Sequence, residues 1–220
     1  MNTTRVALIA GATGLVGNLC LRRTCASDVY RAVIAWGRRA PDFTDPKLQA
    51  ISGDLNHPEF AVYAPTDAFC ALGTTIKVAG SEAAFRLVDL TYVTQFAAAA
   101  KAAGATRFVL VSALGADPQS RVFYNRVKGE AEAAIRALGF ATTVVLRPSL
   151  LVGARTTARP LERASIVAGS IAAPFMVGPL RKYRPIQASL VASAMVDAAR
   201  GAPPGYSIIE SDRIGSHKYA

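Results

Sequence analysis

The chain has 220 residues, of which 51% are hydrophobic and 18% are charged, and its formal net charge is +10. This composition is typical of one globular domain rather than of a disordered chain, and the positive charge favours an anionic partner such as a phosphorylated cofactor or an acidic substrate. Binding to nucleic acid is disfavoured, because the Lys and Arg residues are scattered and form no dense run with interleaved aromatic residues.

Short apolar runs alternate with helix-length segments from the start of the chain. The runs predict strands at 5–10, 32–36, 48–51, 68–72, 107–112 and 142–146, each nearly continuously apolar, as expected of strands buried on both faces. Helices are predicted at 15–25, at 81–103 between the N-cap Ser81 and Gly104, and at 122–138, ending at Gly139. The alternation predicts a Rossmann-type α/β fold, a doubly wound parallel sheet with helices on both faces.

After Arg147 the pattern loosens, and prolines separate short segments. We expect a helix at 187–200 and a last strand at 206–210. Residues 1–220 are therefore predicted to form a single domain, with its core at 1–150. The remaining residues, 151–220, are predicted to form a short C-terminal extension on the substrate side of the sheet.

Three glycines, Gly11, Gly14 and Gly17, follow the first predicted strand and lead into a helix. Glycine permits a tight turn and a close approach of the backbone to a pyrophosphate, and a helix N-terminus attracts phosphate groups. The alternative is a strand-to-helix turn with glycines for geometry alone; the order strand, loop, helix favours the dinucleotide site. The residues expected to contact the cofactor here are Gly11, Thr13, Gly14, Leu15, Val16 and Gly17.

The end of the second predicted strand lacks the carboxylate that commonly binds the ribose hydroxyls of NAD. Arg38 and Arg39 stand there instead, and a guanidinium group can form a two-pronged contact with a 2′-phosphate. The sequence therefore favours NADP(H) over NAD(H). Two solvated loop arginines are the alternative interpretation.

Tyr124 and Lys128 stand four residues apart in the predicted helix 122–138, so their side chains share one helix face. Such a pair is compatible with proton transfer, but also with a tyrosine that packs beside a solvated lysine. The spacing alone favours the second interpretation, so the rest of the chain must decide.

Six motifs resemble, in order, those of the short-chain dehydrogenases/reductases. More narrowly, the chain is similar to their atypical NAD(P)H-binding branch, near the Tat-interacting-protein type and the nucleotide-sugar epimerases. The motifs are GATGLVG (11–17), GDL (53–55), ALGTT (71–75), FVLVSALGAD (108–117), YNRVK (124–128) and LRPSLLVG (146–153).

The resemblance implies a role for each matching position. Tyr124 would be the general acid/base, Lys128 would hold the nicotinamide ribose and favour the tyrosinate, and Ser112 would hydrogen-bond the substrate oxygen. The remaining cofactor contacts would come from Asp54, Leu55, Leu72, Gly73, Thr74 and Pro148. One position departs from the family pattern, because Asp89 stands where many relatives have an asparagine. For Ser112, a strand-end hydroxyl that caps a turn is the alternative.

The resemblance implies an NADP(H)-dependent oxidoreductase that moves a hydride between the nicotinamide and a carbonyl or secondary alcohol. Positive charge near Tyr124 would bring the pKa of its phenol from about 10 toward the working range. Two alternatives stay open. One is an NADPH-binding regulatory or assembly protein with little turnover, and the other is an enzyme like the nucleotide-sugar epimerases.

Three cysteines without a Cys-x-x-Cys pair predict reduced thiols and a cytoplasmic location, and two histidines predict no metal site. No transmembrane helix is expected. The expected partner is a small-molecule substrate, acidic if a basic rim forms at the mouth of the site from Arg155, Arg159, Arg163, Arg181, Lys182 and Arg184. The apolar stretch 165–178 is compatible with a core helix, a substrate lid, an oligomer contact or a peripheral membrane contact. Both a monomer and a homodimer stay open.

Overall fold

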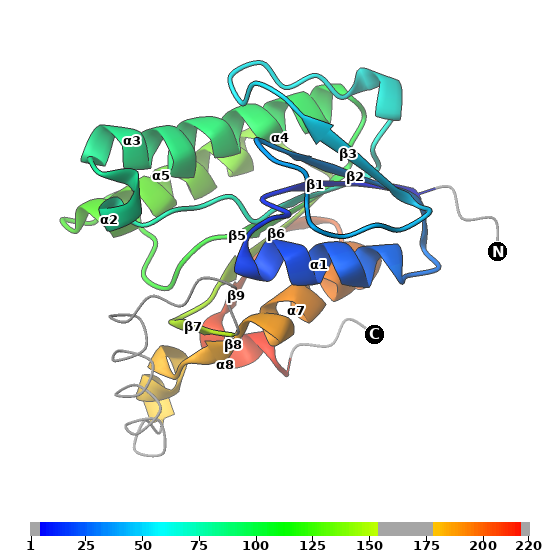
Figure 1. The fold of residues 1–220 in the computed structure, drawn as a ribbon. Coiled ribbons are helices and arrows are strands. Elements are labelled where there is room, and N and C mark those ends of the chain that lie inside the picture. Colours follow the sequence, from blue (N-terminus) through cyan, green and yellow to red (C-terminus); the bar gives the residue numbers. More distant parts are fainter. Residues whose placement is uncertain (1–4, 154–177, 217–220) are drawn as a thin grey trace.

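The computed structural model describes residues 5–153 and 178–216, and its centre is a seven-stranded parallel sheet (Figure 1). The strands lie in the order β3-β2-β1-β4-β5-β6-β9, and every neighbouring pair is parallel. Their bounds are β1 Arg5–Ala10, β2 Tyr30–Gly37, β3 Leu48–Ser52, β4 Asp67–Cys70, β5 Arg107–Val111, β6 Thr142–Arg147 and β9 Gly205–Glu210. The strand order reverses between β1 and β4, which is where parallel sheets of this kind open a crevice for a ligand.

Helices cover both faces of the sheet. On one face, α1 (Leu15–Cys25) packs beside α7 (Ala188–Gly201), and on the other α4 (Tyr92–Ala102) packs beside α5 (Phe123–Leu138) (Figure 1). Each face has its own apolar core, one built around Leu21, Phe69 and Met195 and the other around Trp36, Phe96 and Phe108. The predicted Rossmann-type architecture is confirmed.

The helix predicted at 81–103 is interrupted in the structure. Ser81 caps its start by accepting a hydrogen bond from the Ala84 N–H (3.1 Å). Only α3 (Glu82–Arg86) and α4 are α-helical, however, and between them Leu87–Thr91 forms a π-helical turn, η2. A π turn adds a residue to a helix and shifts which side chains face inward. Here the fully buried residue of the turn is Asp89.

The C-terminal segment completes the sheet instead of only covering one end of it, because β9 pairs with β6 along its whole length. The smaller elements are α2 (Ile76–Ala79), α8 (Ser211–Ile214), the 3₁₀ turns η1 (Ala61–Tyr63) and η4 (Gly178–Tyr183), and a two-stranded pair of β7 (Leu151–Val152) with β8 (Ile186–Gln187).

The strand predicted at 48–51 was wrongly expected to be buried on both faces. β3 is the edge of the sheet, and all five of its residues are exposed or half-buried. Within the described part of the chain, no helix has the length and apolar character needed to cross a membrane. Residues 165–177 of the apolar stretch lie outside the described residues, as do Arg155, Arg159 and Arg163.

The three buried thiols predict a loss of stability in alkali. Burial raises the pKa of Cys20 and Cys70 to about 12 and that of Cys25 to about 11. The folded state therefore keeps protons that the unfolded chain releases above about pH 8.5, so stability is fully present below that pH and falls above it. Between about pH 7.5 and 9.5 we expect a loss of about 1.4 kcal/mol for each fully buried thiol, measured by urea unfolding.

A Cys20→Ala/Cys70→Ala variant is the matched control, and its stability should fall less steeply over the same pH range. Equal slopes for the variant and the wild type would contradict the prediction.

Candidate active site

The glycine loop between β1 and α1 is packed too closely for side chains. Gly11 has φ +83°, and a Cβ added to it would lie 2.5 Å from the carbonyl carbon and oxygen of Ala71, directly after β4. A Cβ on Gly17 would lie 2.1 Å from the Gly11 carbonyl oxygen. These contacts place the N-terminus of α1 against the carboxyl ends of β1 and β4.

The first turn of α1 is suited to an anion. Gly14 is the N-cap, so the backbone N–H groups at the helix start donate no hydrogen bond to a capping side chain, and the turn contains no acidic residue. Free N–H groups and the positive end of the helix dipole attract phosphate. Leu15, Val16 and Gly17 form this turn and supply such groups.

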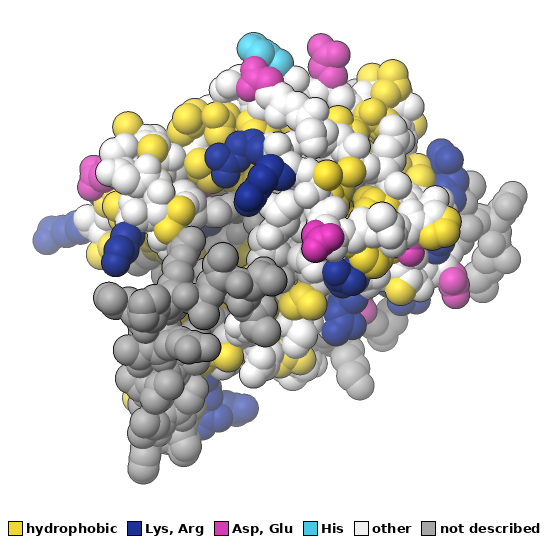
Figure 2. Space-filling view, in the orientation of Figure 1, with side chains coloured by type: hydrophobic (Ala, Val, Ile, Leu, Met, Phe, Trp, Pro, Cys, Tyr) yellow, Lys and Arg dark blue, Asp and Glu magenta, His cyan; other side chains and the backbone are white. Residues whose placement is uncertain are grey.

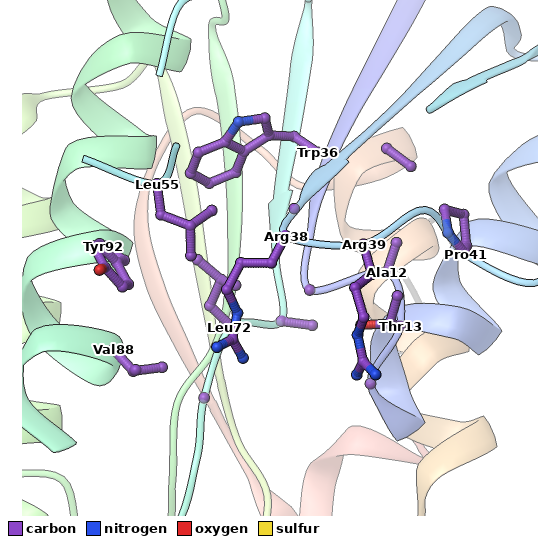
Figure 3. Close-up of a pocket in the computed structure, with 16 residues that line it drawn as sticks. Ala12, Thr13, Trp36, Arg38, Arg39, Pro41, Leu55, Leu72, Val88 and Tyr92 are labelled. Atoms are coloured by element: carbon purple, nitrogen blue, oxygen red, sulfur yellow. The ribbon is translucent and has the colours of Figure 1, made fainter. Parts of the chain in front are cut away.

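A cleft opens between this loop and the ends of β2 and β4 (Figure 3). Eight of the residues predicted to contact the cofactor line it, namely Gly11, Thr13, Gly14, Arg38, Arg39, Leu55, Leu72 and Gly73. The lining also includes Trp36, Pro41, Val88 and Tyr92, which were not predicted because they resemble ordinary core residues in the sequence. The other six predicted contacts do not line this cleft, namely Leu15, Val16, Gly17, Asp54, Thr74 and Pro148. The exposed Asp54 carboxylate instead accepts hydrogen bonds from Asn56.

The arginines after β2 belong to the cleft. The guanidinium groups of Arg38 and Arg39 extend in the same direction, one beside Leu72 and the other beside Thr13 (Figure 3). Figure 2 shows Lys and Arg side chains gathered at the centre of this face, between the region of α4 and that of α1. The cleft thus combines an apolar wall, where a planar base can pack, with two cations at its rim.

Tyr124 and Lys128 lie on one face of α5, and Lys128 is buried (6% exposed). The Lys128 Nζ forms an ion pair of 2.6 Å with Oδ1 of Asp89, whose other oxygen accepts a hydrogen bond from the Thr74 N–H (2.8 Å). A Cβ on Gly73 would lie 3.2 Å from Asp89 Oδ1 and 3.5 Å from Lys128 Nζ. The ion pair therefore lies directly behind the backbone that lines the cleft.

The environment keeps Lys128 charged. Burial alone would lower the pKa of its ammonium group, but the negative charge of Asp89, the proximity of Tyr124 and the hydrogen bond to Asp89 raise it above the ordinary value. The Tyr124 ring packs against the buried ring of Phe85, with centroids 5.4 Å apart. A charged lysine and a half-buried phenol thus share one helix face beside the cleft.

The structure gives Ser112 a different neighbour from the one expected. Its hydroxyl donates a hydrogen bond to Glu132, which also accepts two hydrogen bonds from Arg147 (3.0 and 2.6 Å), and Arg147 reaches Glu210 (3.2 Å). Glu132 lies eight residues after Tyr124 on α5, about 12 Å along the helix axis. These contacts make Ser112 part of a network that joins β5, β6, β9 and α5.

Of the predicted basic rim, the structure describes only Arg181, Lys182 and Arg184. Arg181 and Lys182 are exposed on η4, and Arg184 is half-buried at its end.

Comparisons with known proteins support a nucleotide-binding role for the cleft. Residues 11–173 match the model of a protein family described as NAD(P)H-binding. The chain is 38% identical over 161 residues to the mitochondrial protein FMP52-1 of Scheffersomyces stipitis (70% of this chain, 71% of the relative). It is 35% identical over 160 residues to the protein HTATIP2 of Rattus norvegicus (70% of this chain, 66% of the relative).

Two solved structures show the same fold at low sequence identity. The protein MoeE5, in complex with UDP-glucose and NAD, matches with a TM-score of 0.69 at 19% identity, covering 96% of this chain and 79% of that one. A UDP-glucose 4-epimerase from Thermotoga maritima matches with a TM-score of 0.71 at 15% identity, covering 94% and 77%.

The expected cytoplasmic location was wrong. The FMP52 relatives from several fungi are named mitochondrial proteins. The expectation rested on reduced cysteines, and these distinguish reducing from oxidising surroundings but do not distinguish one reducing compartment from another.

The glycine contacts predict that Gly17→Ala abolishes cofactor binding. The added methyl group would overlap the Gly11 carbonyl, so the loop must shift, and we expect a loss of about 1–3 kcal/mol in stability as well. Isothermal titration with NADPH and urea unfolding measure the two effects. Gly215→Ala is the matched control, because its nearest neighbour would be a Leu190 methyl group at an ordinary 3.6 Å; an unaffected Gly17→Ala variant would contradict the prediction.

Proposed function

The chain belongs to the NAD(P)H-binding family of atypical short-chain dehydrogenases/reductases, and on that premise we propose that it is an NADP(H)-dependent oxidoreductase acting on a carbonyl or a secondary alcohol. The observation that carries the proposal is the position of Tyr124 and the buried Lys128. They share one face of α5, and Lys128 lies behind Gly73, which lines the cleft.

The residues present fit a phosphorylated dinucleotide. The first turn of α1 would bind the pyrophosphate, and Trp36, Leu55 and Tyr92 would provide the apolar wall for the adenine. Arg38 and Arg39 would bind a 2′-phosphate, since no carboxylate at the end of β2 would repel it. When bound, the cofactor supplies the hydride.

The role of the chain itself is to position the substrate and to protonate its oxygen. Tyr124 Oη would give a proton to the oxygen of a carbonyl substrate, or take one from an alcohol. Lys128 stands one helical turn from Tyr124 and would hold the nicotinamide ribose. The hydroxyl of Ser112 is held by Glu132, so Tyr124 carries the proton transfer in this proposal.

A second candidate is an NADPH-binding regulatory or assembly protein with little turnover. The occupied hydroxyl of Ser112 and the paired charge of Lys128 favour it, because both groups already have internal partners.

The positions of Arg38 and Arg39 in the cleft predict a preference for NADPH over NADH. Arg38→Ala should weaken NADPH binding by about 10- to 100-fold, the effect of losing a charged hydrogen bond, and should change NADH binding much less. Fluorescence titration with both cofactors measures this difference. Arg31→Ala is the control, since it removes an exposed positive charge seven residues earlier on β2, about 23 Å away. Equal losses for both cofactors would show that Arg38 does not select the phosphate.

Removal of the phenol hydroxyl distinguishes the two candidate functions. If the protein is an oxidoreductase, a panel of carbonyl compounds with NADPH will include a substrate. Tyr124→Phe should then lower its turnover by about 10²- to 10⁴-fold while cofactor affinity is kept. If no carbonyl compound is reduced although NADPH binds tightly, the regulatory function is favoured.

A further inference from the structure

Asp89 is a buried acid beside the pair Tyr124 and Lys128. Its side chain is 0% exposed, one oxygen contacts Lys128 at 2.6 Å, and the other accepts the Thr74 N–H at 2.8 Å. A carboxylate is costly to bury, and it is retained in a protein interior only when its charge and hydrogen bonds are satisfied. The charge of Asp89 is paired with Lys128 and its second oxygen is hydrogen-bonded to the Thr74 N–H, so that Asp89 joins the loop after β4 to α5.

The π turn explains how Asp89 reaches this position. Leu87 is exposed and Asp89 is buried within the same five residues, which form the π turn η2 between α3 and α4. A π turn in an otherwise α-helical segment is frequent at functional sites. Here it directs the carboxylate to Lys128 and to the backbone of the cleft.

The charges around Lys128 cancel. The ionisable groups that face its ammonium group are Asp89 from η2, Tyr124 from α5 and Cys70 from β4. The Cys70 thiol is neutral near pH 7, because burial raises its pKa to about 12. One turn further along α5, Glu132 is paired with Arg147. The pair of Asp89 and Lys128 therefore presents no net charge to Tyr124.

We propose that Asp89 is a positioning residue that neutralises Lys128, so that Tyr124 lies beside a neutral ion pair instead of a lone cation, which makes the site a proton donor and favours carbonyl reduction over alcohol oxidation. The inference rests on the proposed function and assigns its direction. An unpaired Lys128 would favour the phenolate, the form that accepts a proton from an alcohol.

The proton balance in the reducing direction is simple. The O–H bond of Tyr124 would break as its proton passes to the substrate oxygen, and a bound reduced nicotinamide cofactor would supply the hydride for the new C–H bond. The phenolate then takes a proton from solvent. Asp89 and Lys128 exchange no proton with the substrate in this scheme.

The test is a spectroscopic titration of Tyr124 in the cofactor-free protein. The phenolate absorbs in the near ultraviolet, and subtracting the titration of Tyr124→Phe isolates Tyr124 from the other tyrosines. The same subtraction in the Asp89→Asn background, against Asp89→Asn/Tyr124→Phe, gives the effect of the carboxylate. We expect the midpoint of Tyr124 to fall by about one pH unit or more in Asp89→Asn, a tenfold change in its ionisation. An unchanged midpoint overturns the proposal.

A double variant that removes both charges is the control for misfolding of Asp89→Asn. Asp89→Asn leaves the charge of Lys128 buried without a partner, and circular dichroism will show whether the variant folds. Asp89→Asn/Lys128→Met removes both charges, so we expect the Tyr124 midpoint of the wild type. A higher midpoint would mean that Lys128 dominates in the wild type and that Asp89 does not cancel it, which also overturns the proposal.

The titration uses neither cofactor nor substrate, so its result is independent of the proposed function. Suppose that no turnover is found but that the Tyr124 midpoint falls in Asp89→Asn as expected. The proposed oxidoreductase activity would then be wrong, and the charge pairing of Asp89 with Lys128 would still hold. If turnover is found, the pH at which reduction declines should move down in Asp89→Asn with the Tyr124 midpoint. A pH profile that stays unchanged would overturn the assigned direction alone.

Discussion

The cleft depends on one close contact, the approach of the Gly11 backbone to the backbone of Ala71. A methyl group on Gly11 would lie 2.5 Å from the Ala71 carbonyl, and the Ala71 N–H donates to the Ala10 carbonyl at 2.9 Å. β1 and β4 therefore end side by side, and the chain leaves them in different directions, into α1 and into the loop of Leu72–Thr74. The phosphate-binding turn, the apolar wall and the ion pair behind Gly73 all take their positions from this junction.

The structure places two electrically different regions next to each other. At the open end, two arginines and an uncapped helix start offer positive charge to an anion. At the inner end, Asp89 and Lys128 are buried and cancel each other. Affinity for a phosphorylated cofactor and control of a proton are thereby assigned to separate groups, because a charge at the exposed rim is screened from the interior by solvent and salt.

Much of the fold could be predicted from the sequence because local patterns determine it. The strand 5–10 and the helix 15–25 have the predicted bounds, and Ser81 and Gly139 mark helix ends as expected. The π turn could not be predicted, since one extra residue hardly alters apolar periodicity over a long helix. The neighbour of Ser112 depends on how α5 packs across the sheet, and the pairing of positions 89 and 128 is a long-range contact; neither leaves a local signal. The apolar wall of the cleft was not predicted for a related reason, because Trp36 and Tyr92 have the character of core residues.

The pairing of α1 with α7 has a consequence for how the chain is made. α1 ends at Cys25, and the helix that covers it begins at Ala188, so the two are synthesised far apart in time. During translation the face of α1 that packs on α7 is complete but uncovered while most of the chain emerges, and long-range contacts of this kind slow folding. β9, the last strand of the sheet, follows α7 and closes β6 only at residues 205–210. A nascent chain of this protein therefore remains open to association with chaperones, or with other nascent chains, until residues 205–210 have left the ribosome.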